Sequence, residues 1–151
     1  MDTLAFLQRL QELGFLFHGS PLCLEEIEPR KGRDNTSEIG RQTAVYAAND
    51  YRLAVVKAVL RPCAKDSSYG WSRAKAGLLY VRGYGVDCGA GYVHVLNAYD
   101  FHEVWEAKKF EIISFTSVRP VQVIAVNEKS MMSLPNSTFE IAKDFLTPPN
   151  F

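Results

Sequence analysis

The second half of the chain is a series of short apolar segments separated by turn-forming residues, and this pattern limits the folds open to it. Four runs of four or five residues are rich in β-branched and aromatic side chains. They span residues 78–81, 92–96, 111–115 and 122–126. Runs of this length are typical of strands, and the glycines, Asp100 and Pro120 between them predict turns. We therefore expect a mainly antiparallel sheet here.

The first half alternates between helical and strand-like periodicity. The predicted elements are a helix over residues 3–13, a strand over 15–18, a strand over 44–47 and a helix over 51–60. Gly14 is a suitable stop for the first helix, and Asn49 or Asp50 is a suitable N-cap for the second. His18 is followed by Gly19-Ser20-Pro21, which predicts a tight turn directly after the first strand.

Four further segments give weaker patterns. Residues 22–29 suggest about one helical turn, because leucines and Ile27 lie on one side and three glutamates on the other. The polar residues 30–42 and the segment 64–75 are expected to be surface loops. Ser137 and Glu140 have the spacing of a capping box, which predicts a last helix over residues 137–145.

Helices early and strands late indicate an α+β domain with a mainly antiparallel core. The chain has 151 residues, which is the usual size of one domain, so residues 1–151 are expected to form a single domain. A chain of this length buries roughly 70% of its unfolded surface, so a core can form without metals or disulfides. Cys23, Cys63 and Cys88 form no CxxC pair, and we expect buried or partly buried free thiols.

Charge and hydropathy exclude several classes of function. Seventeen basic residues balance seventeen acidic ones, which argues against a large nonspecific nucleic-acid surface, although a local basic pocket remains open. No apolar stretch approaches the roughly 20 residues that cross a bilayer. The first residues carry Asp2 and an interrupted apolar run, unlike a signal peptide. A cytoplasmic location without membrane partners is the default expectation.

Three side chains are candidates for chemistry, and each has a structural alternative. His18 ends an apolar strand beside Gly19, where a ligand can approach the backbone; taken alone, it fits better a histidine hydrogen-bonded inside a turn with no ligand. Tyr46 lies between small residues that leave room over its ring, or it packs in the core. Glu111 opens an apolar strand, where a carboxylate is costly unless it is paired or solvated; it could also simply face solvent.

The order and strand placement of these residues resemble the ADP-ribosyltransferase superfamily. His18-Gly19-Ser20 at the end of one strand, Tyr46-Ala47-Ala48 in the next and Glu111 opening a later one are similar to its His-Tyr-Glu branch, which includes diphtheria toxin and the poly-ADP-ribose polymerases. The resemblance covers about a third of the chain, mainly residues 15–30, 43–60 and 110–126. It implies a split antiparallel sheet flanked by helices, with NAD as co-substrate and no metal.

The resemblance also implies roles for individual residues. His18 would bond the ribose 2′-hydroxyl, and the Gly19 backbone would hold the nicotinamide carboxamide. Tyr46 would stack on the nicotinamide ring. Glu111 would bond the nicotinamide-ribose 2′-hydroxyl and favour the cationic, oxocarbenium-like transition state.

Three arginines in or beside the loop after the first strand, Arg30, Arg33 and Arg41, could contact the pyrophosphate. Arg30 is the first choice because Pro29 restricts the backbone before it. Ser20 would bond a ribose hydroxyl or only shape the turn.

The chain departs from the family pattern in two places. The polymerase branch usually has a second tyrosine downstream that lies near the nicotinamide. Tyr51 is too close to Tyr46 in the sequence to be assigned that role. Lys109 stands where the arginine-modifying branch has a second acidic residue, so the acceptor stays open among protein, nucleic acid and small molecule. A toxin that hydrolyses NAD is a variant of this hypothesis. The alternatives are a noncatalytic module that binds NAD, ADP-ribose or a protein, and a tRNA 2′-phosphotransferase-like enzyme on the same fold.

Overall fold

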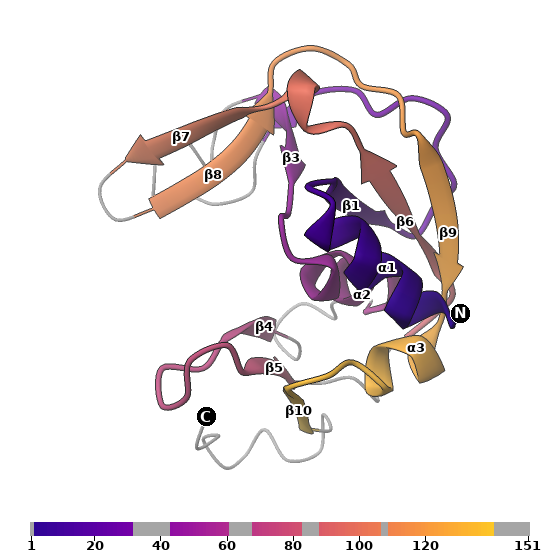
Figure 1. The fold of residues 1–151 in the computed structure, drawn as a ribbon, viewed down its shortest axis with the longest axis vertical. Helices are drawn as coiled ribbons and strands as arrows, with labels where there is room; N and C mark the ends of the chain where they lie inside the picture. Colours follow the sequence, from indigo (N-terminus) through magenta and orange to yellow (C-terminus); the bar gives the residue numbers. More distant parts are fainter. Residues whose placement is uncertain (1, 32–42, 61–67, 83–87, 107–108, 141–151) are drawn as a thin grey trace.

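The computed structural model describes residues 2–31, 43–60, 68–82, 88–106 and 109–140, which form three small sheets and a few helices (Figure 1). The helices are α1 (Thr3–Glu12), α2 (Tyr51–Val59), α3 (Glu128–Met132) and a 3-10 turn at Ala98–Asp100. The first five strands are β1 (Leu16–Ser20), β2 (Arg30–Lys31), β3 (Thr43–Ala47), β4 (Ser68–Trp71) and β5 (Leu79–Arg82). The remaining strands are β6 (Gly91–Leu96), β7 (His102–Glu106), β8 (Lys109–Ser114), β9 (Gln122–Val126) and β10 (Ser137–Glu140).

The three sheets are mainly antiparallel, which confirms the α+β class. Their strand orders are β1-β6-β9, β10-β5-β4 and β2-β3-β8-β7, and within them only β10 and β5 run parallel. Figure 1 shows α2 between the sheet of β1, β6 and β9 and the sheet of β4, β5 and β10. Both of these sheets pack apolar side chains against α2.

Helix α2 is the centre of the larger core. Its residues Ala54 to Val56, Ala58 and Val59 are all 0–1% exposed. A helix that is apolar around most of its circumference is stable only where it is covered on several sides. Phe17, Val93 and Val95 cover it from one sheet, and Leu79 and Val81 cover it from another. Helical periodicity indicates one apolar face through Leu53, Val56 and Leu60, whereas the structure buries the helix around most of its circumference.

A second, smaller core lies where β1, β3 and β8 meet. It consists of Leu16, Ile27, Val45, Leu96, Ile112 and Val118. Two reciprocal backbone bonds between Phe17 and Ala48, of 2.8 and 2.9 Å, join β1 to the end of β3. The sheet of β1 and the sheet of β3 therefore meet at one bridge and separate on either side of it.

The expected helical turn over residues 22–29 is wrong. Tertiary bonds hold this segment in a nonhelical path. The Leu24 amide donates to the His94 ring, and Ile27 exchanges both backbone bonds with Val118. The amides of Leu24 and Ile27 therefore donate to distant acceptors, whereas in a helical turn they would be unpaired or would bond within the turn.

The expected helix at residues 137–145 is also wrong where it is described, because Ser137–Glu140 forms β10 beside β5. The Ser137 hydroxyl donates to the Leu134 carbonyl instead of capping a helix, and Phe139 packs against the larger core. Residues 141–145 lie outside the described residues. The capping box of this region is Asn127 with Ser130, at the start of α3.

Other predicted elements agree within a residue or two. Helix α2 begins after Asp50, whose side chain accepts from the Arg52 amide as an N-cap. Strand β1 continues through Gly19 and Ser20, so the tight turn begins later than predicted. Strand β4 lies inside the segment 64–75 that was expected to be a loop, and β7 and α3 were not anticipated. Of residues 30–42, only Arg30 and Lys31 are described, and they form β2.

The described cysteines are free thiols, as expected, but Cys23 is exposed rather than buried, while Cys88 is half-buried. Cys63 lies outside the described residues. Among the helices that the structure describes, none has the length and apolar character needed to cross a membrane.

Candidate functional site

The separation of β1 from β3 leaves part of the β1 backbone without a strand partner on one edge. Phe17 directs its N–H and C=O toward β3, where its N–H donates to the Ala48 carbonyl and its C=O accepts from the Ala48 N–H. Residues two apart in a strand direct these groups to the same edge. Gly19 therefore points its N–H and C=O to the β3 side, beyond the last bridge, where no described strand pairs with it. One donor and one acceptor thus lie side by side at this edge.

Glycine is required at position 19 because α2 crosses directly over it. A Cβ built on Gly19 would clash with the backbone carbonyl of Ala54. Gly91 on β6 has the same relation to the carbonyl of Ala58. The two glycines let α2 approach the sheet closely. Gly19 thus allows α2 to pack closely because it has no side chain, and its N–H and C=O lie at the open edge.

His18 bonds to the strand across the separation. Its Nδ1 lies 3.0 Å from the carbonyl oxygen of Tyr46. A carbonyl only accepts, so Nδ1 carries the proton and Nε2 is the nitrogen left to accept. The ring therefore joins β3 to β1, whereas the structural alternative for His18 expected a bond inside a turn. The predicted ribose contact would have to use Nε2.

His94, which the sequence analysis did not single out, lies directly opposite His18 on β6. It is 0% exposed, and the two ring centroids lie 6.0 Å apart. Its Nδ1 donates to the His18 carbonyl at 3.1 Å, and its Nε2 accepts from the Leu24 amide at 2.9 Å. Both nitrogens are satisfied only in the neutral ring. Its place within an apolar strand run was the available signal.

Burial lowers the pKa of both histidines. For His18 desolvation is the main cause, the bond to Tyr46 opposes it, and the charges of Lys57, His94 and Arg30 lower the pKa further. For His94 desolvation again dominates, opposed by the bond to His18. Both rings are therefore neutral at neutral pH, and Lys57 and Arg30 make the surroundings of His18 positive.

Tyr46 and position 111 share a face of the β3–β8 pair. Tyr46 lies opposite Ile113, and Glu111 precedes Ile113 by two residues on β8. Side chains two apart in a strand, and those directly opposite across a pair, lie on one face. The half-buried Tyr46 thus faces away from the smaller core that contains Val45. The side chain of Glu111 itself lies outside the described part of the structure.

His18 leaves β1 on the other side. By the same alternation the His18 side chain shares a face with Leu16 and Ser20, on the side of the smaller core. Its Nδ1 bonds to the backbone carbonyl of Tyr46 and not to the Tyr46 ring. The structure therefore brings His18, Gly19 and the Tyr46 backbone together at the strand separation. Tyr46 and Glu111 are grouped by strand register.

Four further residues were predicted to contact the ligand: Ser20, Arg30, Arg33 and Arg41. Ser20 is buried, and its hydroxyl accepts from the Leu22 amide at 3.1 Å, so it shapes the turn, which was one of the two roles expected. Arg30 is exposed on β2 and pairs with Ala44 through its backbone. Arg33 and Arg41 lie outside the described residues. Within the described ranges, no group of histidine, cysteine and acidic side chains is arranged to hold a metal ion.

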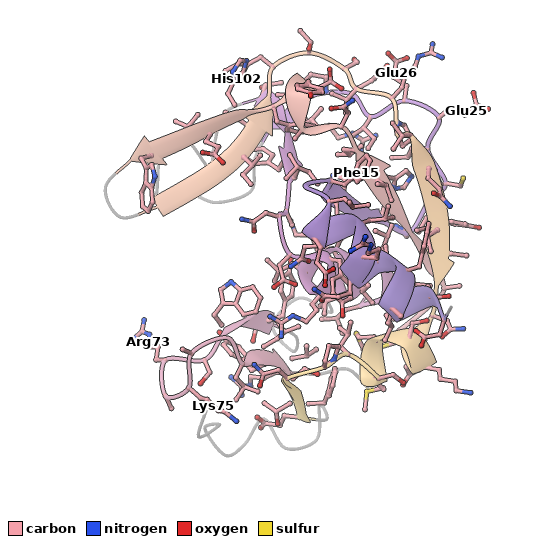
Figure 2. All side chains as sticks on the ribbon, viewed as in Figure 1. Phe15, Glu25, Glu26, Arg73, Lys75 and His102 are labelled. Carbon is pink, nitrogen blue, oxygen red and sulfur yellow. The ribbon has the colours of Figure 1, made fainter. Side chains whose placement is uncertain are left out.

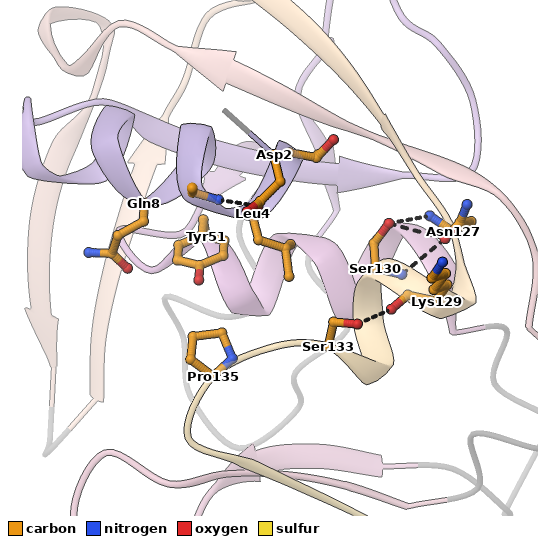
Figure 3. A pocket seen from close by; sticks show the side chains of 11 residues that line it. Asp2, Leu4, Gln8, Tyr51, Asn127, Lys129, Ser130, Ser133 and Pro135 are labelled. Atoms are coloured by element: carbon orange, nitrogen blue, oxygen red, sulfur yellow. Dashed lines mark hydrogen bonds between the residues drawn. The ribbon is translucent and has the colours of Figure 1, made fainter.

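A hollow of about 730 Å³ lies elsewhere, between the start of α1, α3 and Pro135 (Figure 3). None of the predicted site residues whose side chains the structure describes lines it. Its polar groups already serve the helices: Asp2 accepts from the Ala5 amide, and the Ser133 hydroxyl donates to the Lys129 carbonyl.

The open edge at Gly19 is suited to a planar amide, which offers one acceptor and one donor at the spacing of a backbone. A neutral ring acceptor at His18 and the cations Arg30 and Lys57 suit hydroxyl and phosphate groups near it. No protein-family model, curated protein or solved structure matches this chain in any of the three comparisons made.

Proposed function

We propose that this chain is an ADP-ribosyltransferase that binds NAD where β1 separates from β3 and cleaves its nicotinamide–ribose bond. The observation that carries the proposal is the edge of Gly19 beside the His18–Tyr46 bond, with which none of the described strands pairs. A nicotinamide carboxamide needs one donor and one acceptor in a plane, which the N–H and C=O of one extended residue supply. The split sheet of the ADP-ribosyltransferase fold is part of this proposal.

The register of β8 supports a catalytic place for Glu111. A carboxylate at this position shares a face with Tyr46, so a ring stacked on Tyr46 would have Glu111 beside it. The neighbouring β7 pairs Val104 with Glu111. These relations follow from the backbone alone.

In the proposed reaction, the residues of this chain mainly bind, orient and stabilise charge. Gly19 holds the carboxamide at the strand edge, Tyr46 covers the ring on one face of the sheet, and the Nε2 of His18 accepts a ribose hydroxyl on the face of the smaller core. Positive charge grows at the anomeric carbon as the bond to nicotinamide lengthens, and the fixed carboxylate of Glu111 stabilises it. The anomeric carbon then forms its new bond to an acceptor, which is water or a nucleophile on another molecule.

Nicotinamide release from NAD by the full chain tests the proposal. We expect Glu111→Gln to lower the rate by about 10²–10³-fold, because a preorganised charge is removed from the transition state. Glu103→Gln is the matched control, since Glu103 lies on the adjacent strand opposite Ile112 and is exposed. Equal release by wild type and Glu111→Gln would exclude the role of Glu111.

Binding is measured separately by the thermal shift that NAD produces. A ligand at about 100 times its Kd stabilises the folded state by about 2.7 kcal/mol. A shift without any nicotinamide release would support the noncatalytic binding module instead. No shift at millimolar NAD would exclude the site.

A further inference from the structure

We propose that the turn of the β4–β5 hairpin binds single-stranded nucleic acid, with a base stacked on Trp71 and phosphates beside Arg73 and Lys75. The proposed NAD site shares none of these residues, so this inference does not depend on it. Three features of the hairpin support it: a partly exposed indole, a loop held by local hydrogen bonds, and a local excess of positive charge.

Trp71 ends β4 with one side covered and a large part of its surface open. The guanidinium carbon of Arg52 lies 4.9 Å from the ring centroid, and the residue remains 42% exposed. Arg52 is itself fixed, because it bonds to Asp50 at 2.9 Å and to the Gly77 carbonyl at 3.1 Å. An aromatic ring held in this way loses little further freedom when a planar group stacks on it.

The loop after Trp71 is fixed by local bonds. The Ser72 hydroxyl accepts from the amides of Ala74 and Lys75 at 3.1 and 3.2 Å. The Ser72 amide donates to the Leu78 carbonyl at 2.8 Å and closes the loop. The exposed Arg73 and Lys75 are therefore carried on a defined loop, two and four residues after Trp71.

Charge is strongly segregated in a chain whose formal net charge is zero. Residues 68–82 contain Arg73, Lys75 and Arg82 and no acidic side chain, and Arg82 pairs with Glu140 of β10 at 3.7 Å. Residues 21–29 contain three glutamates and no lysine or arginine. Figure 2 shows Arg73 and Lys75 at one end of the molecule and Glu25 and Glu26 at the opposite end. An anionic partner is attracted to the hairpin end and repelled from the other.

An accessible indole beside two cations favours a nucleic acid over an acidic peptide. Bases have planar faces that stack on tryptophan, and phosphates match the cations, whereas aspartate and glutamate use only the charges. Single strands are favoured over duplexes because their base faces are accessible. The surface suits one or two nucleotides, which agrees with the absence of a net positive charge.

The test measures the fluorescence anisotropy of a labelled oligothymidylate of about 12 nucleotides with the full chain at low salt. We expect binding that weakens as salt is raised, because phosphate contacts release counterions. In a Trp105→Phe background the emission comes from Trp71 and should be quenched on binding. A duplex of the same length should bind more weakly.

Two variants separate stacking from charge. Trp71→Ala should weaken binding about tenfold, and Arg73→Glu/Lys75→Glu should weaken it at least as much and flatten the salt dependence. The second variant changes only exposed loop residues, so it keeps the test valid where Trp71→Ala fails to fold. Glu25→Gln/Glu26→Gln is the control and should leave binding nearly unchanged.

Two results would overturn the proposal: no binding by the wild type, or binding that both variants leave unchanged. Equal or tighter binding of a polyglutamate peptide at this hairpin would identify an acidic protein surface as the partner instead.

Discussion

Helix α2 and the β7–β8 hairpin are opposites in how they are held. Helix α2 packs on β1, β6 and β9 and also on α1 and α3, and most of its side chains are fully buried. The hairpin extends from the body in Figure 1, β7 packs mainly on β8, and Trp105 is 71% exposed. Apolar burial is the main favourable term in folding, so the stability of this protein resides around α2.

The proposed NAD site takes residues from both regions. Gly19 lies under α2, whereas Glu111 lies on β8 at the hairpin. Changes near α2 should therefore act first on folding, and changes on the hairpin should act on function with little effect on folding.

Gly91→Ala should have the largest effect, about 3 kcal/mol or more of lost stability. The added Cβ meets the backbone carbonyl of Ala58, which cannot move without shifting α2. Urea denaturation measures the change. Gly70→Ala is the control, since its Cβ would lie 3.1 Å from the Tyr80 hydroxyl, the end of a side chain that can adjust. Equal costs for the two variants would contradict the special role of the α2 contact.

Arg52→Ala should cost about 2–3 kcal/mol and loosen the β4–β5 hairpin. Its guanidinium joins Asp50 to the carbonyls of Gly77, Pro135 and Asn136, and its side chain is only 12% exposed. Removing it leaves a half-buried carboxylate and three acceptors without this partner. Urea denaturation measures the loss in free energy of unfolding, and faster hydrogen exchange of the β4–β5 amides would show that the hairpin is the part that loosens.

The control for this prediction is Arg9→Ala on α1. Arg9 forms an exposed pair with Glu12 at 3.4 Å, and exposed pairs contribute well under about 1 kcal/mol. A loss at Arg52 no larger than the loss at Arg9 would show that the hairpin is held by its apolar contacts alone.

His94→Phe should cost about 2 kcal/mol, because the Leu24 amide loses its acceptor and the His18 carbonyl loses a donor. It should also change the dependence of stability on pH. The pKa values of His18 and His94 are lowered in the folded state, so the unfolded chain binds more protons below about pH 6.5.

Stability should therefore be complete above about pH 6.5 and fall as the pH decreases toward the folded pKa values. The slope is at most about 1.4 kcal/mol per pH unit for each histidine. Removing His94 should reduce the slope. The exposed His102→Gln serves as the control for loss of a histidine. An unchanged slope in His94→Phe would show that His94 does not contribute.

Trp105→Ala should change stability by less than about 0.5 kcal/mol, because 71% of the residue is already exposed. Thermal and urea denaturation measure the effect. A loss above 1 kcal/mol, on the order of a buried contact, would show that the hairpin is held more firmly than its packing indicates.

Local signals predicted several elements well. Asp50 before Tyr51 marked the start of α2, and Gly14 marked the end of α1. The strand at Tyr46 and the four strands predicted in the second half, which are β5, β6, β8 and β9, also lie within a residue or two of where they were expected. Segment 22–29 and residues 137–140 were mispredicted because their hydrogen-bond partners, His94, Val118 and β5, are distant in sequence.

The sequence by itself determined the α+β class and named Gly19, His18, Tyr46 and Glu111 as residues of interest, because caps, turns and strand periodicity are local properties. Only the tertiary structure decided how these residues relate. The Phe17–Ala48 bridge sets which edge Gly19 presents, and the bond between His18 and Tyr46 fixes the ring tautomer. These features depend on which strands pair and in which register, and pairing is set by contacts between residues far apart in the chain.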